Sequence, residues 1–409
     1  MIVVIDIAVM GHGVVGSGVV EVLLNNADSI AKRAADTINI KYILDLRDFP
    51  DSPLADRFTK DFNDILNDSS VKIVVECMGG INPAYNFVKS CLLAGKSVVT
   101  SNKELISVKG QELLTIAKNN NLNLLFEASV GGGIPIIRPI CQCLTANEIY
   151  QITGILNGTT NFILTKMVDE NMSFDDALKM AQELGYAERD PSADVDGIDT
   201  CRKIAILASL SFGKNVDPDL IKTEGIRNIT LEDVKYAEKW GGVIKLIGTV
   251  SKLESGNVVP AVYPAFVSNE SQLSSVNDVF NAILVSGDAI GDVMFYGRGA
   301  GKLPTASAVV ADVVDCVKHI SARKYVYWDE AEKTYVEDSD KFSGNMFVRI
   351  KTNNYTSALG IITDAFESVQ VLSDEGDEVA FITEGTKSDI FDKLNKNHFE
   401  PVSLIHVLK

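Results

Sequence analysis

The sequence predicts an α/β protein with a doubly wound parallel sheet, a second α+β domain with a mostly antiparallel sheet, and a small C-terminal α/β module. Three observations support this prediction. A glycine-rich turn separates an apolar strand from a helix at residues 11–16, alternating apolar segments lie between residues 245 and 297, and strand and helix patterns alternate from residue 345 onward. The chain of 409 residues is longer than one hydrophobic core usually serves, so two or three domains are expected.

The composition fits a soluble globular enzyme. A formal net charge of −17 argues against nucleic acid or an anionic membrane surface as a partner. No apolar run approaches ~18 residues, so no membrane span is expected, and we predict a cytoplasmic protein. The 6 cysteines lie in apolar or helical runs and are expected to be reduced core residues. Cys141 and Cys143 have no second cysteine or histidine cluster at metal-ligand spacing, so zinc is not expected.

The first predicted element is a buried strand at residues 2–9, followed at once by Gly11, Gly13 and Gly16. These glycines fit G-x-G-x-x-G between a strand and a helix, the context that dinucleotide binding requires. The helix N-terminus then offers free amides to the phosphates of a ligand. The pattern predicts a Rossmann-like dinucleotide-binding domain, and a glycine-rich turn without a ligand is the alternative.

The next predicted strand, INIKYILDL, ends close to Arg47 and Asp48. An acidic residue at this point of a dinucleotide-binding sheet favours NAD, whereas an arginine accommodates the 2′-phosphate of NADP. Asp45 and Arg47 are two positions apart and share a face of the strand. The pattern therefore leaves both cofactors open.

Two further segments are candidates for ligand contact. Residues 71–103 read as strand, glycine turn, helix and strand, which places Lys103 at the carboxyl edge of a parallel sheet, where ligands bind. A solvated loop lysine is the alternative. Residues 123–134 give a strand, Glu127 and a triple glycine. One carboxylate with several main-chain carbonyls suits a hard, weakly held cation, and a tight turn is again the alternative.

Acidic residues are densest at 188–199, and the group closes on Lys203. A helix is predicted at 173–184, with Ser173 as its N-cap and Gly185 at its C-terminal end, and a second helix begins near residues 196–198. Asp199 and Lys203 are four apart and share a face of that second helix. One interpretation is an exposed ion pair worth only ~0.3–0.5 kcal/mol. The other is a site in which carboxylates bind an ammonium and a hydroxyl while the lysine transfers a proton.

The run A-x3-G-Y-A-E-x-D-P-x2-D-V-x-G-x-D-x3-K, from Ala181 to Lys203, resembles the pattern of the homoserine dehydrogenase family. The resemblance implies that Lys203 is the catalytic lysine. It makes Glu188 and Asp199 substrate-binding carboxylates and Asp194 a further acidic group near the reacting centre. It also implies that the backbone of Gly185 contacts both substrate and cofactor.

Other segments extend this resemblance over roughly residues 3–320. The E-x-x-G-G run at 76–80 and Ser101-Asn102-Lys103 imply that Lys103 is a second lysine of the catalytic site. The run GILNGTTNFIL implies that Gly158 and Thr159 line the substrate pocket, and G-R-G-A-G at 297–301 resembles a second cofactor turn with Arg298 in place of proline. The implied cofactor residues are Gly11, Gly13, Val14, Val15, Gly16, Arg47, Lys103, Gly185 and Gly301. The implied ligands of sodium or a similar monovalent ion are Glu127, Val130, Gly132 and Ile134.

The resemblance also suggests a domain division. We expect a dinucleotide-binding domain at 1–135 with a return segment at about 297–320, a substrate-binding and dimerisation domain at 136–320, a polar linker at 321–342 and a module at 343–409. The module resembles the regulatory ACT domain, of βαββαβ type. The usual D-x-P-G turn is replaced by TNNYTSA. Effector binding, for example of threonine, and a role in subunit contact alone are therefore both left open.

The resemblance implies an NAD(P)-dependent oxidoreductase that interconverts L-homoserine and L-aspartate 4-semialdehyde. This reaction belongs to threonine, methionine and isoleucine biosynthesis. The Arg47-Asp48 pair matches the Arg-Asp of the family and favours NADP over NAD. A homodimer or homotetramer is expected. The alternatives are a related dehydrogenase for another small semialdehyde and a non-catalytic dinucleotide sensor, which would not need both Lys103 and Lys203.

Overall fold

The computed structural model describes residues 3–324 and 326–408 and divides into two compact units. The first unit contains Met1–Ile149, Ala205–Pro218 and Ser286–Glu332, and the second contains Tyr150–Ile204, Asp219–Val285 and Lys333–Lys409. None of the helices among the described residues combines the length and the apolar character that crossing a membrane would require.

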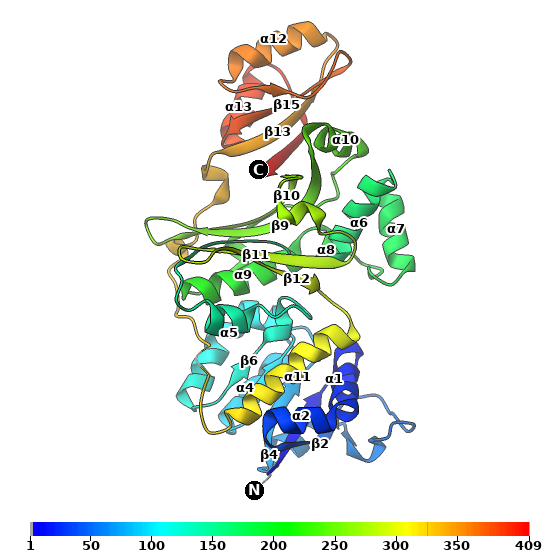
Figure 1. Cartoon of the computed structure of the whole chain (residues 1–409), viewed down its shortest axis with the longest axis vertical. Coiled ribbons are helices and arrows are strands. Elements are labelled where there is room, and N and C mark those ends of the chain that lie inside the picture. The colour runs from blue at the N-terminus through cyan, green and yellow to red at the C-terminus, as the bar shows by residue number, and fades with distance from the viewer. Residues whose placement is uncertain (1–2, 325, 409) are drawn as a thin grey trace. The chain divides into compact units, whose positions relative to one another are not determined.

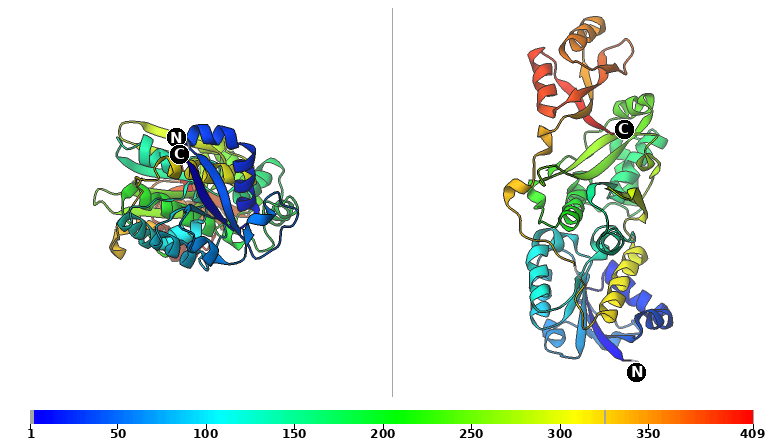
Figure 2. Two further views of the ribbon diagram at one scale, coloured as in Figure 1. Left: turned by 90° about the horizontal axis from the view of Figure 1, so that it is seen from below. Right: turned by 60° about the vertical axis from the view of Figure 1, so that its left-hand side comes forward.

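The first unit is built on a sheet of 6 strands in the order β3-β2-β1-β4-β5-β6. Every neighbouring pair is parallel, which confirms the predicted doubly wound sheet. Helices cover both faces of the sheet (Figure 2). The strands are β1 (Val4–Met10), β2 (Thr37–Leu44), β3 (Phe58–Thr59), β4 (Val71–Glu76), β5 (Ser97–Thr100) and β6 (Leu124–Leu125). The first predicted strand began at residue 2, which lies outside the described residues.

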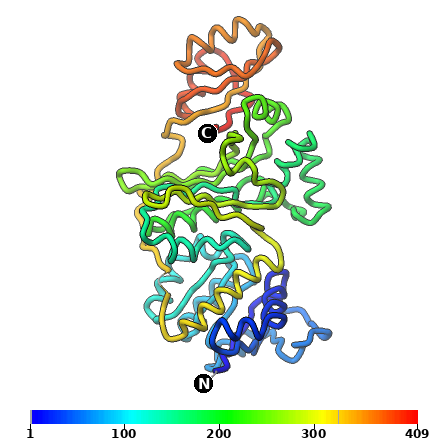
Figure 3. The backbone as a smooth tube through the Cα atoms, in the orientation of Figure 1, coloured from blue at the N-terminus to red at the C-terminus, as the bar shows by residue number. Residues whose placement is uncertain are grey.

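The helices of this unit follow the predicted alternation with strands. They are α1 (Val14–Asn25), α2 (Ala27–Ala34), α3 (Phe62–Leu66), α4 (Ala84–Leu93), α5 (Lys103–Asn119) and α11 (Lys302–Lys318). The last of them follows β12 (Gly291–Arg298) and lies beside α1, so the chain returns to the parallel sheet late in the sequence (Figures 1 and 3). Gly18 permits this close approach, because a Cβ there would lie 2.8 Å from the carbonyl oxygen of Lys302.

The segment predicted as a polar linker contains a buried anchor. Trp328 is packed in the first unit against Gly110 of α5 and edge-on to the ring of Phe126, and its indole Nε1 donates to Asn215 Oδ1 at 3.1 Å. Buried tryptophans normally find such a hydrogen-bond acceptor. This part of 321–342 is therefore fixed to the first unit. Residue 325 of the predicted linker is not among the described residues.

The second unit contains a mixed sheet with strands in the order β11-β7-β9-β10-β16-β13-β15-β14, and β8 also pairs with β10. The long strands β9 and β10 are antiparallel, as are β7 and β9, in agreement with the predicted mostly antiparallel sheet. The strands of its first part are β7 (Ile149–Ile155), β8 (Lys222–Thr223), β9 (Gly242–Lys252), β10 (Val258–Ser268) and β11 (Phe280–Gly287). The helices are α6 (Gly158–Asp169), α7 (Phe174–Glu183), α8 (Ser192–Val195), α9 (Ile198–Phe212) and α10 (Leu231–Trp240).

The C-terminal segment has the element order β-α-β-β-α-β. Its elements are β13 (Gly344–Lys351), α12 (Tyr355–Ala365), β14 (Gln370–Val371), β15 (Glu378–Gly385), α13 (Lys387–Lys396) and β16 (Pro401–Leu408). Residues of both helices and of β13 and β15 share one hydrophobic core, with the helices on one face of the strands (Figure 1). Strand β16 pairs in parallel with β10, so this segment continues the sheet of the second unit.

Candidate active site

The acidic loop between α7 and α9 has the predicted helix boundaries. Ser173 caps α7 by accepting a hydrogen bond from the backbone N–H of Asp176, and Gly185 follows the helix with φ +75°, a conformation that favours glycine. The next long helix begins at Ile198, as expected. The short helix α8 within the loop was not predicted.

Lys203 and Asp199 form a buried ion pair near the N-terminus of α9. Lys203 Nζ lies 2.8 Å from Asp199 Oδ2, and the two side chains are only 9% and 4% exposed. The same ammonium donates to the main-chain oxygen of Leu156 at 2.7 Å. The exposed surface pair is therefore the wrong interpretation of this i,i+4 spacing. Taking two charges out of water is expensive, so a pair of this kind requires a specific hydrogen-bonded environment.

Asn157 supplies much of that environment. Its side-chain Nδ2 donates to Asp199 Oδ2 at 2.8 Å and to Asp194 Oδ1 at 2.7 Å, while its Oδ1 accepts from the N–H of Thr160 and caps α6. The Asn157 amide thus links two of the predicted acidic residues to the start of α6. Asn157 was not among the predicted site residues. The available signal was an asparagine directly before a helix, which is a preferred N-cap.

The loop after α7 is tied to the first turn of α6. Thr159 Oγ1 donates to the carbonyl oxygen of Tyr186 at 2.7 Å, and Gln182 Nε2 donates to the carbonyl oxygen of Glu188 at 3.0 Å. The Glu188 side chain is exposed, and no hydrogen bond within the described part of the chain joins its carboxylate to the buried group. The structure therefore gathers Lys203, Asp199, Asp194, Gly158 and Thr159 within the second unit and leaves Glu188 at the surface beside them.

The glycine turn before α1 is shaped for an anion. Gly11 has φ +91°, and a Cβ on Gly16 would lie 1.8 Å from the carbonyl oxygen of Gly11, so a larger residue at position 16 would not fit this turn. Gly13 is the N-cap of α1 and provides no side-chain cap, which leaves the first-turn amides, including those of Val14 and Val15, available to a ligand. Helix N-termini of this kind bind phosphate groups.

Asp45 and Arg47 interact with each other after β2. Arg47 donates through Nε to Asp45 Oδ1 at 3.0 Å and through Nη2 to Asp45 Oδ2 at 2.9 Å, and the backbone N–H of His12 donates to the same carboxylate. The guanidinium beside it holds the pKa of Asp45 well below its usual range. A cavity of about 260 Å³ adjoins this pair and is also lined by Phe49 and Lys60.

Lys103 begins α5 directly after β5, at the predicted carboxyl edge of the parallel sheet. Asn102 caps this helix by accepting from the N–H of Leu105. Nearby, the buried carboxyl of Glu76 accepts a hydrogen bond from Thr100 Oγ1 at 2.6 Å and from the N–H of Met78 at 2.7 Å. Burial raises the pKa of Glu76. These side chains fix the turns that follow β4 and β5.

The Glu127 side chain is used within the protein. Its carboxylate accepts hydrogen bonds from the backbone N–H groups of Ile136, Ile137 and Arg138 at 2.6–2.8 Å. The loop that follows is tightly packed, because a Cβ on Gly132 would lie 2.2 Å from the carbonyl oxygen of Gly299. Outside helices and strands, the described residues show no backbone hydrogen bond to the carbonyl oxygens of Val130, Gly132 and Ile134, while Glu127 begins a 3-10 helix that ends at Ser129. Main-chain carbonyl oxygens of this kind are compatible with a hard cation. Among the described residues there is no cluster of three His, Cys, Asp or Glu side chains that could hold a metal.

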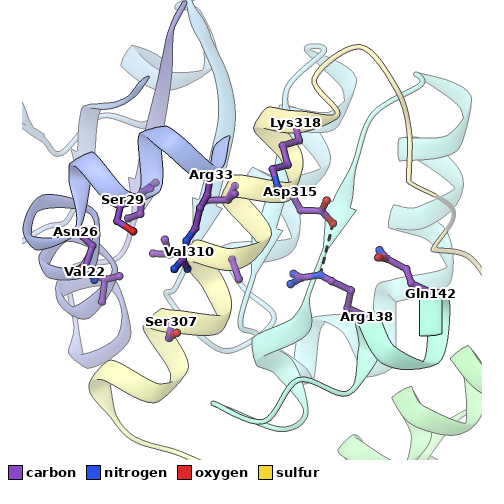
Figure 4. Close-up of a pocket in the computed structure, with 13 residues that line it drawn as sticks. Val22, Asn26, Ser29, Arg33, Arg138, Gln142, Ser307, Val310, Asp315 and Lys318 are labelled. Atoms are coloured by element: carbon purple, nitrogen blue, oxygen red, sulfur yellow. Dashed lines mark ion pairs between the residues drawn. The ribbon is translucent and has the colours of Figure 1, made fainter. Parts of the chain in front are cut away.

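A separate open groove of about 670 Å³ lies between α2, α11 and the π-helical turn Pro139–Cys143 (Figure 4). Arg138 lies on one wall, forms an ion pair with the buried Asp312 and lies 3.7 Å from Asp315. Because Glu127 also accepts from the backbone of Arg138, this pair connects α11 to the loop that begins at Glu127. The predicted site residues do not line the groove.

Comparisons with known proteins agree with this arrangement. The family "Homoserine dehydrogenase, NAD binding domain" matches residues 11–127, and the family "Homoserine dehydrogenase" matches residues 135–314. A homoserine dehydrogenase from Lactococcus lactis is 39% identical over 91% of this chain and 90% of its own length. The crystal structure of a homoserine dehydrogenase from Thiobacillus denitrificans superposes with a TM-score of 0.90 at 32% identity, covering 99% of this chain and 98% of that one.

A hyperthermophilic archaeal homoserine dehydrogenase, solved in complex with NADPH, is 28% identical and covers 76% of this chain and 97% of its own, with a TM-score of 0.64. The first unit has the parallel sheet and glycine turn of a dinucleotide-binding domain, and the second unit contains the buried lysine and carboxylate. The matches to known homoserine dehydrogenases cover nearly the whole chain. The chain belongs to the homoserine dehydrogenase family of NAD(P)-dependent oxidoreductases.

Proposed function

We propose that the chain interconverts L-homoserine and L-aspartate 4-semialdehyde and that Lys203 transfers the proton of this reaction. The observation that supports this role is the buried Lys203–Asp199 pair, whose ammonium is held by two acceptors at 2.7 and 2.8 Å. A catalytic acid needs such fixed geometry, because general acid catalysis requires the proton donor within hydrogen-bond reach of the reacting oxygen. In the reducing direction Lys203 protonates the carbonyl oxygen as it becomes a hydroxyl. In the oxidising direction the same Nζ accepts the hydroxyl proton.

The carboxylates would bind the amino acid part of the substrate. Asp199 and Asp194 are fixed by the amide of Asn157, and Glu188 lies at the surface of the same loop region. We assign the substrate ammonium and hydroxyl to Glu188 and Asp199, with Asp194 contributing negative charge nearby. Gly158, Thr159 and Gly185 would contribute main-chain and hydroxyl hydrogen bonds. Lys103 is proposed as the second lysine that assists proton transfer.

The residues of the glycine turn fit a dinucleotide. The Gly13 cap and the free amides of α1 would hold the pyrophosphate, with Gly301, which has φ +120° at the start of α11, as a further main-chain contact. When bound, the nicotinamide supplies a hydride to the aldehyde carbon or takes one from the alcohol carbon. We propose NADP as the preferred cofactor, because Arg47 neutralises Asp45 and its exposed guanidinium lines the adjoining cavity, where Lys60 is paired with Asp48. The archaeal relative solved with NADPH is consistent with this preference.

We also propose a monovalent cation, such as sodium, at the loop 127–134. The carbonyl oxygens of Glu127, Val130, Gly132 and Ile134 would hold it, since weakly held hard cations prefer oxygen ligands. The Glu127 carboxylate would instead fix the loop through its three amide contacts. Such an ion would have a structural role in this chain rather than a direct role in proton transfer.

We propose that residues 1–135 and the return segment 297–320 form the domain that binds the dinucleotide. Residues 136–320 would bind the substrate and form the contacts of a homodimer or homotetramer. Residues 321–342 would connect the parts, and residues 343–409 would form an ACT-like module. The order β16-β13-β15-β14 and the β-α-β-β-α-β sequence support the last assignment. Because β16 also pairs with β10, we favour a structural or subunit-contact role for this module over effector binding. The proposed setting is threonine and methionine biosynthesis in the cytoplasm.

The experiment that tests this function is an absorbance assay of the reduced nicotinamide with L-homoserine and NADP, and then with NAD. Turnover with L-homoserine and a much lower rate with other small hydroxy amino acids would support the proposal. Faster turnover of another substrate would identify a related dehydrogenase. Tight dinucleotide binding with no turnover of any member of the panel would identify a sensor.

A further inference from the structure

A second buried lysine of the same unit is held without a carboxylate. Lys245 lies on β9 and is 2% exposed. Its Nζ donates to Asn161 Oδ1 at 3.2 Å, to the carbonyl oxygen of Val276 at 2.5 Å and to Asn277 Oδ1 at 3.0 Å. The ion pairs recorded among the described residues do not include it. Burial lowers the pKa of Lys245 to about 8, while Asp169 and Asp278 act in the opposite direction.

Stability alone does not explain this arrangement. An ammonium surrounded by neutral oxygens is costly to bury, because no opposite charge offsets the loss of its hydration. A methionine would fill much of the same space without a buried charge, but it would leave the oxygens of Asn161, Val276 and Asn277 without this donor. The role of Lys245 therefore depends on which residues its hydrogen bonds hold in place.

Asn161 connects this lysine to the loop 276–280. Its Nδ2 donates to the carbonyl oxygens of Val276, Asp278 and Phe280 at 3.0–3.1 Å. The bond from Lys245 occupies Oδ1 and so fixes the orientation of the amide. Asp278 adopts φ +54°, a left-handed conformation that is unfavourable for a residue other than glycine and persists only when surrounding contacts impose it. The hydrogen bonds of the Asn161 amide therefore hold the loop 276–280 in this conformation.

The loop lies directly against the start of α6. A Cβ on Gly158 would lie 2.8 Å from the carbonyl oxygen of Val279. The residue before Gly158 is Asn157, which holds both Asp194 and Asp199. A displacement of the loop would therefore change the position of Gly158 and Asn157, and with them the carboxylates.

We propose that Lys245 and Asn161 are positioning residues that hold the loop 276–280 against Gly158 and thereby fix the substrate-binding end of α6. They act through this loop and do not touch the substrate. The inference rests on the proposed function, since Asn157, Gly158 and Asp199 have been assigned to the substrate site. It goes beyond that function because it identifies what determines the geometry of these groups.

The test compares Lys245→Met with Lys252→Met, an exposed position at the end of the same strand. Lys245→Met is expected to fold and to lower kcat/KM for L-homoserine by about 10–100-fold, since a displacement near 1 Å is costly in an active site. The KM for NADP should stay unchanged, and Lys245→Arg should recover part of the loss. Lys252→Met should resemble the wild type. A folded Lys245→Met protein with wild-type constants would overturn the proposal.

Asn161→Ala provides the second variant if Lys245→Met does not fold, and the same selective loss is expected. Hydrogen exchange measured by mass spectrometry gives a readout that does not depend on the substrate. Both variants should exchange faster than the wild type in peptides covering 156–162 and 276–280. Unchanged exchange there would contradict the positioning role even if the wild type proved inactive on L-homoserine, an outcome that would separately refute the proposed function.

Discussion

The ammonium of Lys203 and Oδ2 of Asp199 lie 2.8 Å apart in an ion pair that is almost entirely buried. The same oxygen accepts a hydrogen bond from Asn157 Nδ2, and the lysine donates a second bond to the carbonyl oxygen of Leu156. The lysine is therefore held from two sides. Residues that act in proton transfer benefit from such restraint, because little reorganisation is then needed during the reaction.

Asp199→Asn should lower kcat/KM for L-homoserine by about 100-fold or more. The substitution removes the negative charge next to Lys203, the proposed proton donor, while the side chain at position 199 keeps nearly the same size. Steady-state kinetics with NADP in excess would measure this. The matched control is Asp196→Asn, three residues earlier, whose carboxylate forms an exposed pair with Arg227. That control should stay within about twofold of the wild type because exposed pairs contribute little. Equal losses in both variants would argue against a special role for Asp199.

Arg47→Gln should raise the KM for NADP by about tenfold or more while the KM for NAD changes little, since a 2′-phosphate would lose a charge-assisted hydrogen bond. Arg33→Gln, an exposed position in the last turn of α2, is the control and should alter neither value. The measurement is the ratio of kcat/KM for the two cofactors. If Arg47→Gln changed both cofactors alike, the assignment of Arg47 to the 2′-phosphate would be wrong.

The buried Asp312 predicts a pH dependence of stability. Burial and the nearby Glu127 raise the pKa of Asp312 to about 7, in spite of its contact with Arg138. The Asp312 carboxyl therefore binds a proton more tightly in the folded protein than in the unfolded chain. The free energy of unfolding that the protonated carboxyl contributes is lost as the pH rises from about 4 through about 7. Urea unfolding of the wild type and of Asp312→Asn at pH 5 and pH 8 would test this. The stability of the wild type relative to the variant should be lower at pH 8, and a higher value would contradict the assignment.

Removal of residues 343–409 should destabilise the second unit. Strand β10 would lose its partner β16, Phe266 would lose the ring of Phe347 stacked at 4.5 Å, and Asp233 would lose the buried guanidinium of Arg349 at 3.1 Å. Leaving one partner of a buried ion pair typically costs about 3–5 kcal/mol. Thermal unfolding of the truncated protein should show a marked fall in Tm or insoluble protein. A soluble truncated chain with wild-type Tm would instead show that the rest of the second unit does not depend on residues 343–409 for its stability.

The parts of the fold that depend on local pattern could be predicted from the sequence. The glycine turn at 11–16 requires close approach of the backbone, and the two ends of α7 follow from Ser173 and Gly185. These features are set by residues close together in the chain. The parallel sheet itself was predicted from the alternation of strands and helices, whereas its strand order is known only from the structure.

Features that depend on distant contacts could not be predicted in the same way. The i,i+4 spacing of Asp199 and Lys203 was clear, but their burial depends on Asn157, which is 42 residues before Asp199. Asp45 and Arg47 were predicted to share a face of a strand, but β2 ends at Leu44, and both residues lie after it, where they form an ion pair. The pairing of β16 with β10 joins strands far apart in the sequence. Periodicity contains no information on such partners.

The most direct test of the central claim is the activity of Lys203→Ala with L-homoserine and NADP, measured together with NADP binding by fluorescence titration. Lys235→Ala, an exposed lysine of α10, is the matched control. The proposed role predicts a fall in kcat of about 10²–10⁴-fold with unchanged NADP affinity, the range typical for loss of a general acid or base. A variant that retains wild-type kcat would contradict proton transfer by Lys203.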